Sequence, residues 1–223
     1  KTFFRPELSQ LHDPFLMKDM DKAVERIEQA ITSREKLLVY GDYDVDGITG
    51  VSILLALLTQ VKADVDYYIP HRIDEGYGLN TDALDSLKAD GVKLVITVDC
   101  GIRSPNEALH ARTIGLDLII TDHHHPDGEN LPPALAVINP KQHGDTYPDK
   151  VLAGVGIAYK LAEALSQKQP LENNFQLDDL LDLVALGTVA DLAPLIGENR
   201  TLVRKGLRAI HQTKRQGLFS LAG

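Results

Sequence analysis

The stretch Lys36-Leu37-Leu38-Val39-Tyr40-Gly41-Asp42-Tyr43-Asp44-Val45-Asp46-Gly47 decides the fold. Its apolar first half is typical of a buried parallel strand, and the apolar run at 48–58 predicts a buried helix. Three aspartates therefore crowd one strand-to-helix turn. Two close carboxylates repel by roughly 4 kcal/mol at an effective dielectric near 20, so a fold that gathers them usually supplies a cation. The stretch predicts a divalent metal site; the alternative is a solvated turn with aspartates at turn and capping positions.

Composition limits the class of protein. The chain has 223 residues, 43% of them hydrophobic, so it can bury one large core. Cys100 is the only cysteine, which excludes internal disulfides and fits a reducing compartment. No run approaches about 18 apolar residues, and the first residues do not form a signal segment, so we expect a cytoplasmic protein with no membrane contact. The net charge of -9 argues against a general polyanion-binding surface.

The remaining apolar runs alternate between strand and helix patterns. We expect further strands at 65–69, 92–98, 116–120 and 134–138. We expect helices at 21–31, 81–89, 105–114, 152–167, 178–186 and 200–212, and an extended lead-in at 1–20. This alternation predicts an α/β fold: an open, mostly parallel sheet with helices on both faces and a helical C-terminal segment.

Polar residues follow three of the predicted strands at their carboxyl ends. The first strand leads into the aspartates at 42–46, the strand at 92–98 into Asp99, and the strand at 116–120 into Asp122-His123-His124. In open parallel sheets, ligands bind beyond the carboxyl ends of the strands. We therefore expect the three groups to meet at one edge.

Carboxylates mixed with imidazoles suit manganese or magnesium, and the histidines favour manganese. A structural zinc site is disfavoured because its usual thiolates are missing. Two ions about 3.5 to 4 Å apart can bind a phosphate and lower the pKa of a bridging water. The predicted reaction is phosphoester hydrolysis.

Each candidate also has a structural alternative. Asp99 could cap a helix, His123 and His124 could be surface histidines, and His125 is more simply interpreted as one. Arg72 could neutralise a phosphate or be an ordinary surface residue. Gly154 and Gly156 could expose N–H groups to an anion or allow close helix packing. Cys100 has no partner arrangement that would activate it, and is interpreted as a buried thiol.

Four ordered motifs resemble the Asp-His-His (DHH) phosphoesterase superfamily. They are Gly41-Asp42-Tyr43-Asp44-Val45-Asp46-Gly47, Thr97-Val98-Asp99-Cys100-Gly101, Thr121-Asp122-His123-His124 and Gly187-Thr188-Val189-Ala190-Asp191. The segments 70–79 and 152–156 look like the RecJ branch, whose members are single-strand-specific 5′ to 3′ DNA exonucleases of repair and recombination. The resemblance covers nearly the whole chain.

The resemblance implies roles for individual residues. The implied cofactor is a pair of Mn2+ ions, with Mg2+ as the alternative, and the implied metal ligands are Asp42, Asp44, Asp46, Asp99, His123, His124 and Asp191. The implied catalytic residues are Asp46, Asp122 and His124. The implied contacts to single-stranded DNA are Arg72, Gly154 and Gly156. Asp191 is chosen on the resemblance alone, since its position could equally cap a turn.

The chain departs from the family in one respect. Members usually carry a second, downstream phosphoesterase-associated domain, and RecJ-like enzymes add an oligonucleotide-binding fold; neither is visible here. We therefore expect residues 21–223 to be the DHH domain of a longer protein, with weak or no nuclease activity on its own because half of the cleft is absent. Two alternative functions stay open: a phosphodiesterase for short oligoribonucleotides or cyclic dinucleotides, and a non-catalytic nucleic-acid-binding subunit.

Overall fold

A computed structural model describes residues 7–128, 130–171 and 175–222 of the chain. Its centre is one five-stranded sheet with the order β2-β1-β3-β4-β5, in which every pairing is parallel. The strands are β1 (Lys36–Gly41), β2 (Asp64–Tyr68), β3 (Val92–Val98), β4 (Asp117–Thr121) and β5 (Ala136–Ile138). The predicted α/β fold with a parallel sheet is confirmed.

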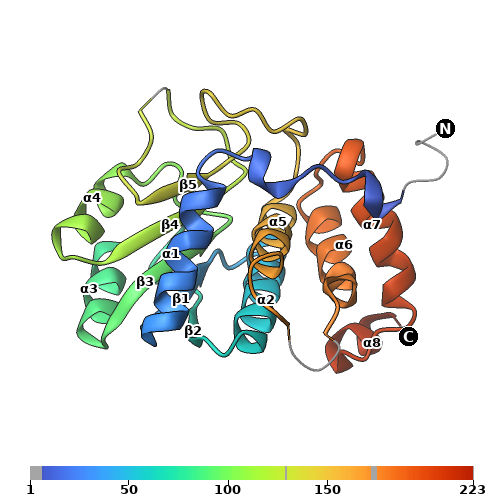
Figure 1. Cartoon of the computed structure of the whole chain (residues 1–223), viewed down its shortest axis with the longest axis horizontal. Coiled ribbons are helices and arrows are strands. Elements are labelled where there is room, and N and C mark those ends of the chain that lie inside the picture. Colours follow the sequence, from blue (N-terminus) through green and yellow to red (C-terminus); the bar gives the residue numbers. More distant parts are fainter. Residues whose placement is uncertain (1–6, 129, 172–174, 223) are drawn as a thin grey trace.

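Helices connect the first four strands in chain order, a loop connects β4 to β5, and further helices follow the sheet (Figure 1). The α-helices are α1 (Met20–Ser33), α2 (Val45–Gln60), α3 (Thr81–Ala89), α4 (Pro105–Thr113), α5 (Gly154–Ser166), α6 (Leu181–Ala190), α7 (Gly197–Ile210) and α8 (Gln216–Ala222). Three short 3₁₀ helices are η1 (Leu8–Gln10), η2 (Pro14–Leu16) and η3 (Leu177–Leu180). Among the described residues, no helix is long and apolar enough to cross a membrane.

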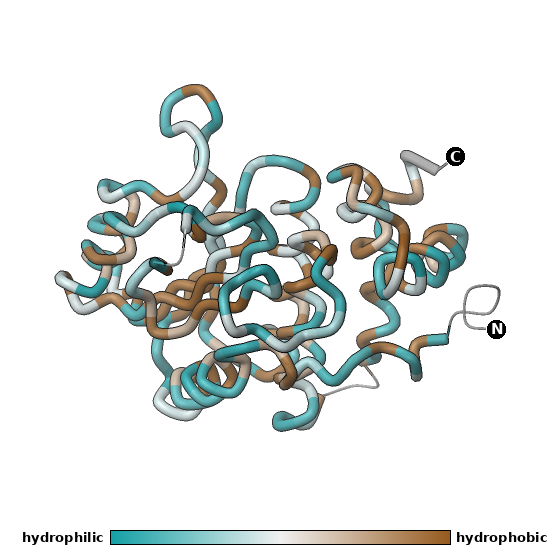
Figure 2. The backbone as a smooth tube through the Cα atoms, turned by 90° about the horizontal axis from the view of Figure 1, so that it is seen from above, coloured by the Kyte–Doolittle hydropathy of each residue, from teal (hydrophilic) through white to brown (hydrophobic). Residues whose placement is uncertain are grey.

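Side chains of the central strands alternate between two apolar clusters, because successive strand residues point to opposite faces. Leu37 and Val39 pack in the cluster that holds α1, α2 and α5. Leu38 and Tyr40 pack in the cluster that holds α3 and α4. Helices therefore cover both faces of the sheet, as predicted. Figure 2 shows the hydrophobic segments concentrated in the interior strands, with hydrophilic segments around them.

The strand order reverses direction between β1 and β3. From β1 the chain moves outward to β2, then returns across β1 to β3 and continues to β4 and β5. Such a reversal opens a crevice at the carboxyl ends of the two strands, because the following connections lead to opposite faces. The Asp42 N–H donates to the Val98 carbonyl (3.2 Å) and so links the two strand ends at this point.

The elements predicted near the two ends of the sequence differ from those in the structure. The prediction of an extended lead-in at 1–20 is wrong over the described residues 7–19, which include η1 and η2. Met17 is 2% exposed and belongs to the core rather than to a loose segment. Residues 1–6 lie outside the described residues. At the other end, α7 begins earlier than the predicted 200–212 helix, and α8 was not predicted.

Candidate metal centre

Asp46 is fixed by two helix N-termini. It lies in the first turn of α2, where the Asp44 side chain caps the helix by accepting from the Gly47 N–H (3.0 Å). The Asp46 carboxylate points inward, and its Oδ2 and Oδ1 accept from the N–H groups of Gly154 (2.7 Å) and Val155 (2.8 Å) at the start of α5. The free N–H groups of a helix start favour a carboxylate in this place.

Two glycines make room for the cluster. A Cβ at Gly154 would lie 2.7 Å from Oδ1 of Asp99, and a Cβ at Gly187 would lie 3.1 Å from Oδ1 of Asp46. Both distances are too short for an unrelaxed contact with carbon. Helices α5 and α6 can therefore approach the carboxylates only because these positions lack side chains.

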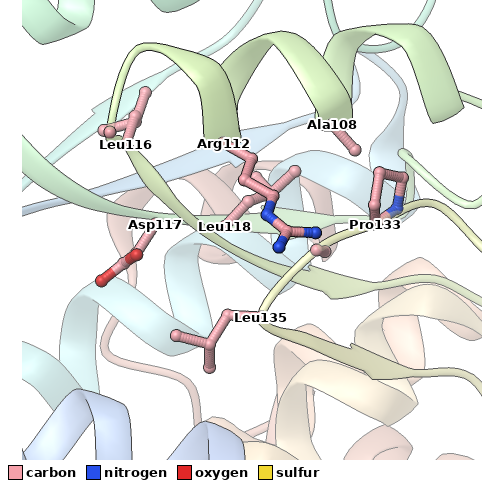
Figure 3. Close-up of a pocket in the computed structure, with 9 residues that line it drawn as sticks. Ala108, Arg112, Leu116, Asp117, Leu118, Pro133 and Leu135 are labelled. Carbon is pink, nitrogen blue, oxygen red and sulfur yellow. The ribbon is translucent and has the colours of Figure 1, made fainter.

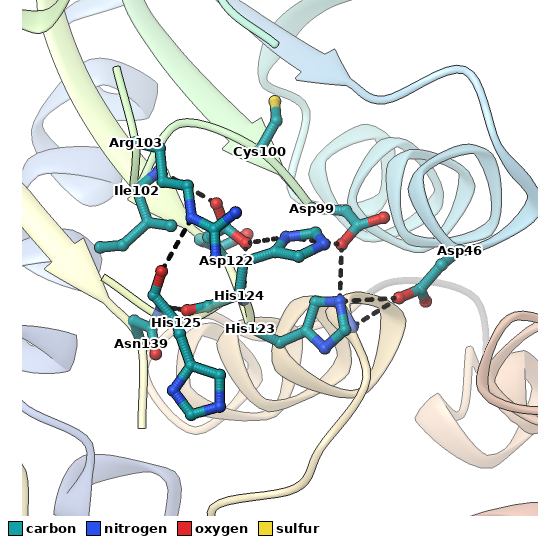
Figure 4. A network of polar contacts seen from close by, with 12 residues as sticks. Asp46, Asp99, Cys100, Ile102, Arg103, Asp122, His123, His124, His125 and Asn139 are labelled. Atoms are coloured by element: carbon teal, nitrogen blue, oxygen red, sulfur yellow. Dashed lines mark hydrogen bonds and ion pairs between the residues drawn. The ribbon is translucent and has the colours of Figure 1, made fainter. Parts of the chain in front are cut away.

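His123 lies between carboxylates from three other segments (Figure 4). Its Nε2 is 3.1 Å from Oδ1 of Asp99 and 3.8 Å from Oδ2 of Asp46, and its Nδ1 is 3.9 Å from Oδ2 of Asp191. Asp99 follows β3 and has the left-handed φ of 62°. His123 follows β4, so neighbouring strand ends supply both residues.

His124 has a different environment from His123. Its Nδ1 lies 2.7 Å from Oδ1 of Asp122, and its backbone N–H donates to the same oxygen (3.0 Å). Oδ2 of Asp122 accepts from the Ile102 N–H (2.9 Å). With Nδ1 committed to Asp122, the Nε2 atom of His124 is the nitrogen that remains for other partners.

Burial and mutual repulsion shift the acid–base equilibria of the cluster. Burial, followed by the charges of neighbouring aspartates, raises the pKa of Asp99 to about 9. Burial and then the charge of Asp99 also raise the pKa of Asp46. Burial lowers the pKa of His123, whereas the hydrogen bond to Asp122 raises the pKa of His124. Without a cation, the cluster therefore favours the protonated forms of Asp99 and Asp46 and a neutral His123.

The donor set fits bound divalent cations. Among the described residues, Oδ1 of Asp99 and Nε2 of His123 are buried without a hydrogen-bond partner, although they face each other. A buried polar pair left unsatisfied needs an explanation, and a shared cation provides one. Three groups of ligand atoms are close enough to hold an ion: Asp99 with His123 and His124; Asp46 with His123 and Asp191; Asp42 with Asp44 and Asp99. Oxygen and imidazole ligands suit Mn2+ or Mg2+.

The structure gathers all the predicted metal ligands, but the predicted substrate contacts differ in position. Arg72 is exposed and lies over the ring of Tyr43, with 5.0 Å between Cζ and the ring centroid. The Gly154 N–H already donates to Asp46. Gly156 is buried, and a Cβ there would lie 3.2 Å from Leu152 Cδ2. For the two glycines, close packing is thus visible, and contact with DNA stays a prediction.

His125 is exposed, and Cys100 is fully buried with its pKa raised by that burial, which agrees with the interpretation of both as non-functional. In Figure 4, the Cys100 sulfur points away from the histidines. The thiol is therefore poorly suited to act as a nucleophile.

Sequence reasoning missed two residues that contact the cluster. The Tyr77 hydroxyl donates to the Asp99 carbonyl (3.2 Å) and lies 3.3 Å from Nδ1 of His124. Asn139, 0% exposed, donates from Nδ2 to the His124 carbonyl (2.9 Å). Gly76 and Gly78, both at positive φ, flank Tyr77, and this Gly-Tyr-Gly pattern was the available signal. Asn139 carried no such signal, because an Asn-Pro pair is typical of a simple strand stop.

A separate hollow lies beside the start of β4, away from the metal-ligand candidates (Figure 3). Its lining includes Arg112 on α4, Asp117 and Leu118 on β4, and Pro133 and Leu135 before β5. The candidate ligands instead follow the far ends of the strands, and none of the three ligand groups found in the described residues includes a lining residue of this hollow. The chemistry belongs at the carboxyl edge of the sheet.

The model of the DHH family, N-terminal domain, matches residues 36–188, which is most of the chain and includes every candidate ligand except Asp191. The structure agrees with this match, because its parallel strands bring Asp and His side chains together at one edge of the sheet. The chain belongs to the DHH family.

Within this family, the chain is similar to RecJ exonucleases in both sequence and structure. The chain is 49% identical to the single-stranded-DNA-specific exonuclease RecJ of Bacillus subtilis over 221 residues, covering 99% of this chain and 27% of that protein. It resembles the crystal structure of an exonuclease RecJ bound to manganese, with a TM-score of 0.82, 38% identity, and coverage of 92% of this chain and 51% of the other. For RecJ from Thermus thermophilus in complex with Mg2+, the TM-score is 0.68 and the identity 31%, covering 100% of this chain and 27% of the other. The chain thus spans about a quarter of the first of these relatives.

Proposed function

We propose that this chain is the metal-dependent catalytic domain of a single-stranded-DNA-specific exonuclease that acts 5′ to 3′ in DNA repair and recombination in the cytoplasm. One observation carries the proposal: Nε2 of His123 and Oδ1 of Asp99 are buried, face each other within a wider ring of carboxylates, and find no hydrogen-bond partner in the described part of the chain. The 49% identity to a RecJ exonuclease supports the choice of substrate.

The proposed cofactor is a pair of divalent cations, Mn2+ or Mg2+. Asp46, His123 and Asp191 would hold one, and Asp42, Asp44 and Asp99 the other. Bound cations supply neutralisation of phosphate charge and a water of lowered pKa as the nucleophile. The third ligand group, with His124, is the weakest in chemical terms because Nδ1 of His124 already pairs with Asp122.

The Asp122–His124 pair is proposed to handle the leaving group. Asp122 fixes the imidazole orientation and favours the protonated ring. His124 can then donate its Nε2 proton to the oxygen that leaves when the phosphorus–oxygen bond breaks, while the attacking water loses a proton to solvent and forms the new phosphorus–oxygen bond. Both Asp46 oxygens accept backbone hydrogen bonds, so we assign Asp46 to ligand binding rather than to proton transfer.

Arg72 and the surface beside His124 are proposed to bind the DNA strand. The exposed Arg72 guanidinium lies over the ring of Tyr43, which stands between the predicted ligands Asp42 and Asp44 in the sequence, and there it can pair with a backbone phosphate. A hollow lined by residues that include Tyr77, Arg103 and Ser104 adjoins His124 and provides room for a nucleotide. Positive and aromatic groups of this kind suit single strands.

The test is digestion of a 5′-labelled single-stranded oligonucleotide, with Mn2+, by the full-length protein that contains this chain, beside a blunt duplex and a cyclic dinucleotide. We expect 5′-mononucleotides from the single strand, none after addition of EDTA, and none from the Asp99→Asn variant. Preferential hydrolysis of the cyclic dinucleotide would instead support the alternative of a phosphodiesterase for small substrates. Binding of Mn2+ and DNA without any hydrolysis would instead indicate the non-catalytic role.

A further inference from the structure

A second buried asparagine, Asn199, joins two segments that carry parts of the metal centre. It lies on the first turn of α7, and its side chain is 0% exposed. Its Nδ2 donates to the carbonyls of Val151 (2.6 Å) and Pro194 (3.1 Å). Val151 precedes the start of α5, which holds Asp46, and Pro194 follows Asp191 by three residues.

Several other contacts hold the first turn of α7, which carries Asn199. The Asp149 carboxylate accepts from the N–H groups of both Glu198 (2.7 Å) and Val151 (3.1 Å). It therefore links the start of α7 to the segment before α5, as the Asn199 side chain also does. The buried Glu198 carboxylate accepts from the His12 N–H (2.8 Å) and lies 3.5 Å from Nζ of Lys160, which is itself 0% exposed. The first turn of α7 therefore has little freedom to move.

The loop that follows Asp191 is, by contrast, mostly exposed. Leu192 has a φ of 59° and is 87% exposed, and Ile196 is 59% exposed. A non-glycine residue in the left-handed region costs roughly 1 kcal/mol or more, so other contacts must hold the loop in place. The bond from Asn199 to the Pro194 carbonyl is one of them.

We propose that Asn199 is a positioning residue for the cation held by Asp46, His123 and Asp191. This inference rests on the proposed metal-dependent function. By holding two carbonyls on one amide, Asn199 sets the separation between the segment that orients Asp46 and the loop that presents Asp191. It touches neither the ion nor the substrate, and it does not serve the second group, Asp42 with Asp44 and Asp99.

The test compares Asn199→Asp with Gln142→Glu in Mn2+ titrations of this chain by calorimetry. Both substitutions turn a buried amide that donates to a backbone carbonyl into a carboxyl group. Among the described residues, both amide oxygens also lack a hydrogen-bond partner, so the two changes are closely matched. Gln142 bonds to the Val137 carbonyl in β5 and not to either of the two segments that Asn199 joins.

We expect the unmodified chain and Gln142→Glu to bind two Mn2+ ions, and Asn199→Asp to lose one or bind it at least tenfold more weakly, with the other unchanged. Equal effects in the two variants, or none in Asn199→Asp, would overturn the inference. Failure of the unmodified chain to bind Mn2+ would overturn the proposed function itself.

A second measurement does not depend on metal or on full stability of the Asp variant. In the milder variant Asn199→Ser with EDTA present, we expect faster hydrogen exchange at the amides of Leu192 and Ala193, which bond to Val189 and Thr188. Exchange at strand amides such as Val95 should change much less. Unchanged exchange at 192 and 193 would show that Asn199 does not restrain the loop.

Discussion

Gly154 and Asp99 touch across the centre: a Cβ built on Gly154 would lie 2.7 Å from Oδ1 of Asp99 and 2.8 Å from its Cβ. We expect Gly154→Ala to push Asp99 away from His123 and to destabilise the fold by about 1 to 3 kcal/mol through overpacking. Affinity for Mn2+ should fall about tenfold or more, measured by calorimetry.

Gly217 provides the control for that change. It lies within α8, and a Cβ there would meet nothing within 4 Å. Gly217→Ala should leave Mn2+ affinity unchanged and stability equal or slightly higher, since alanine favours a helix by about 1 kcal/mol over glycine. Unaltered Mn2+ binding in Gly154→Ala would contradict the tight contact.

The stability of the metal-free protein should fall as pH rises. Asp99 has a pKa of about 9 in the fold against 3.8 as the reference, so the folded state binds the extra proton between these values. Its contribution is fully present below about pH 4 and is lost as the pH approaches 9. Thermal unfolding in EDTA should show Tm decreasing from pH 5 to 9, less steeply in Asp99→Asn.

The size of the expected change in Tm follows from the length of the chain. For a domain of this length, each kcal/mol changes Tm by about 2 to 4 °C. At pH 8, Asp99→Asn should therefore melt several degrees above the unmodified chain in EDTA, because its amide needs no proton to stay neutral. A lower Tm for the variant at that pH would show that the carboxyl is ionised without metal.

Binding of Mn2+ near neutral pH should release protons. Asp46 and Asp99 both have raised pKa values, and ligand carboxyls must ionise to hold a cation. Calorimetric titrations at pH 7 in buffers of different ionisation enthalpy should give a positive proton release that declines towards pH 10. A buffer-independent enthalpy at pH 7 would refute this protonation state.

Loss of the Arg72 side chain should weaken binding of single-stranded DNA and leave binding of Mn2+ unchanged. Loss of a charged hydrogen bond to phosphate costs about 1.5 to 3 kcal/mol, so Arg72→Ala should raise KM for single-stranded DNA roughly 10- to 100-fold. Mn2+ stoichiometry should not change. Arg112→Ala, at the exposed end of α4 beside the remote hollow, is the matched control and should cleave normally.

Much of the fold was predictable because local patterns agreed with it. The strand at 92–98 and the helix at 81–89 were predicted with the observed bounds. Their signals were a mostly apolar run and a cap at Asn80 or Thr81; in the structure the Asn80 side chain accepts from the Ala83 N–H (2.7 Å). The failures came where packing overrides pattern: Met17 is buried by contacts with distant helices, which no short window reveals.

The site was predictable only in part. The residues after β1, β3 and β4 could be brought together by a fold rule, since carboxyl ends of parallel strands share an edge. Asp191 follows a helix rather than a strand and needed the family resemblance. Tyr77 and Asn199 act through backbone carbonyls far away in sequence, and such contacts leave no spacing pattern.

The hydrogen bond from Gly154 to Asp46 spans 108 positions of the chain. Segments from β1, β3, β4, α5 and the end of α6 must all be in place before the carboxylates acquire their geometry. A growing or partly folded chain therefore carries the acidic residues without a working centre. Under the proposed function, DNA would therefore meet this chemistry only after the chain has folded.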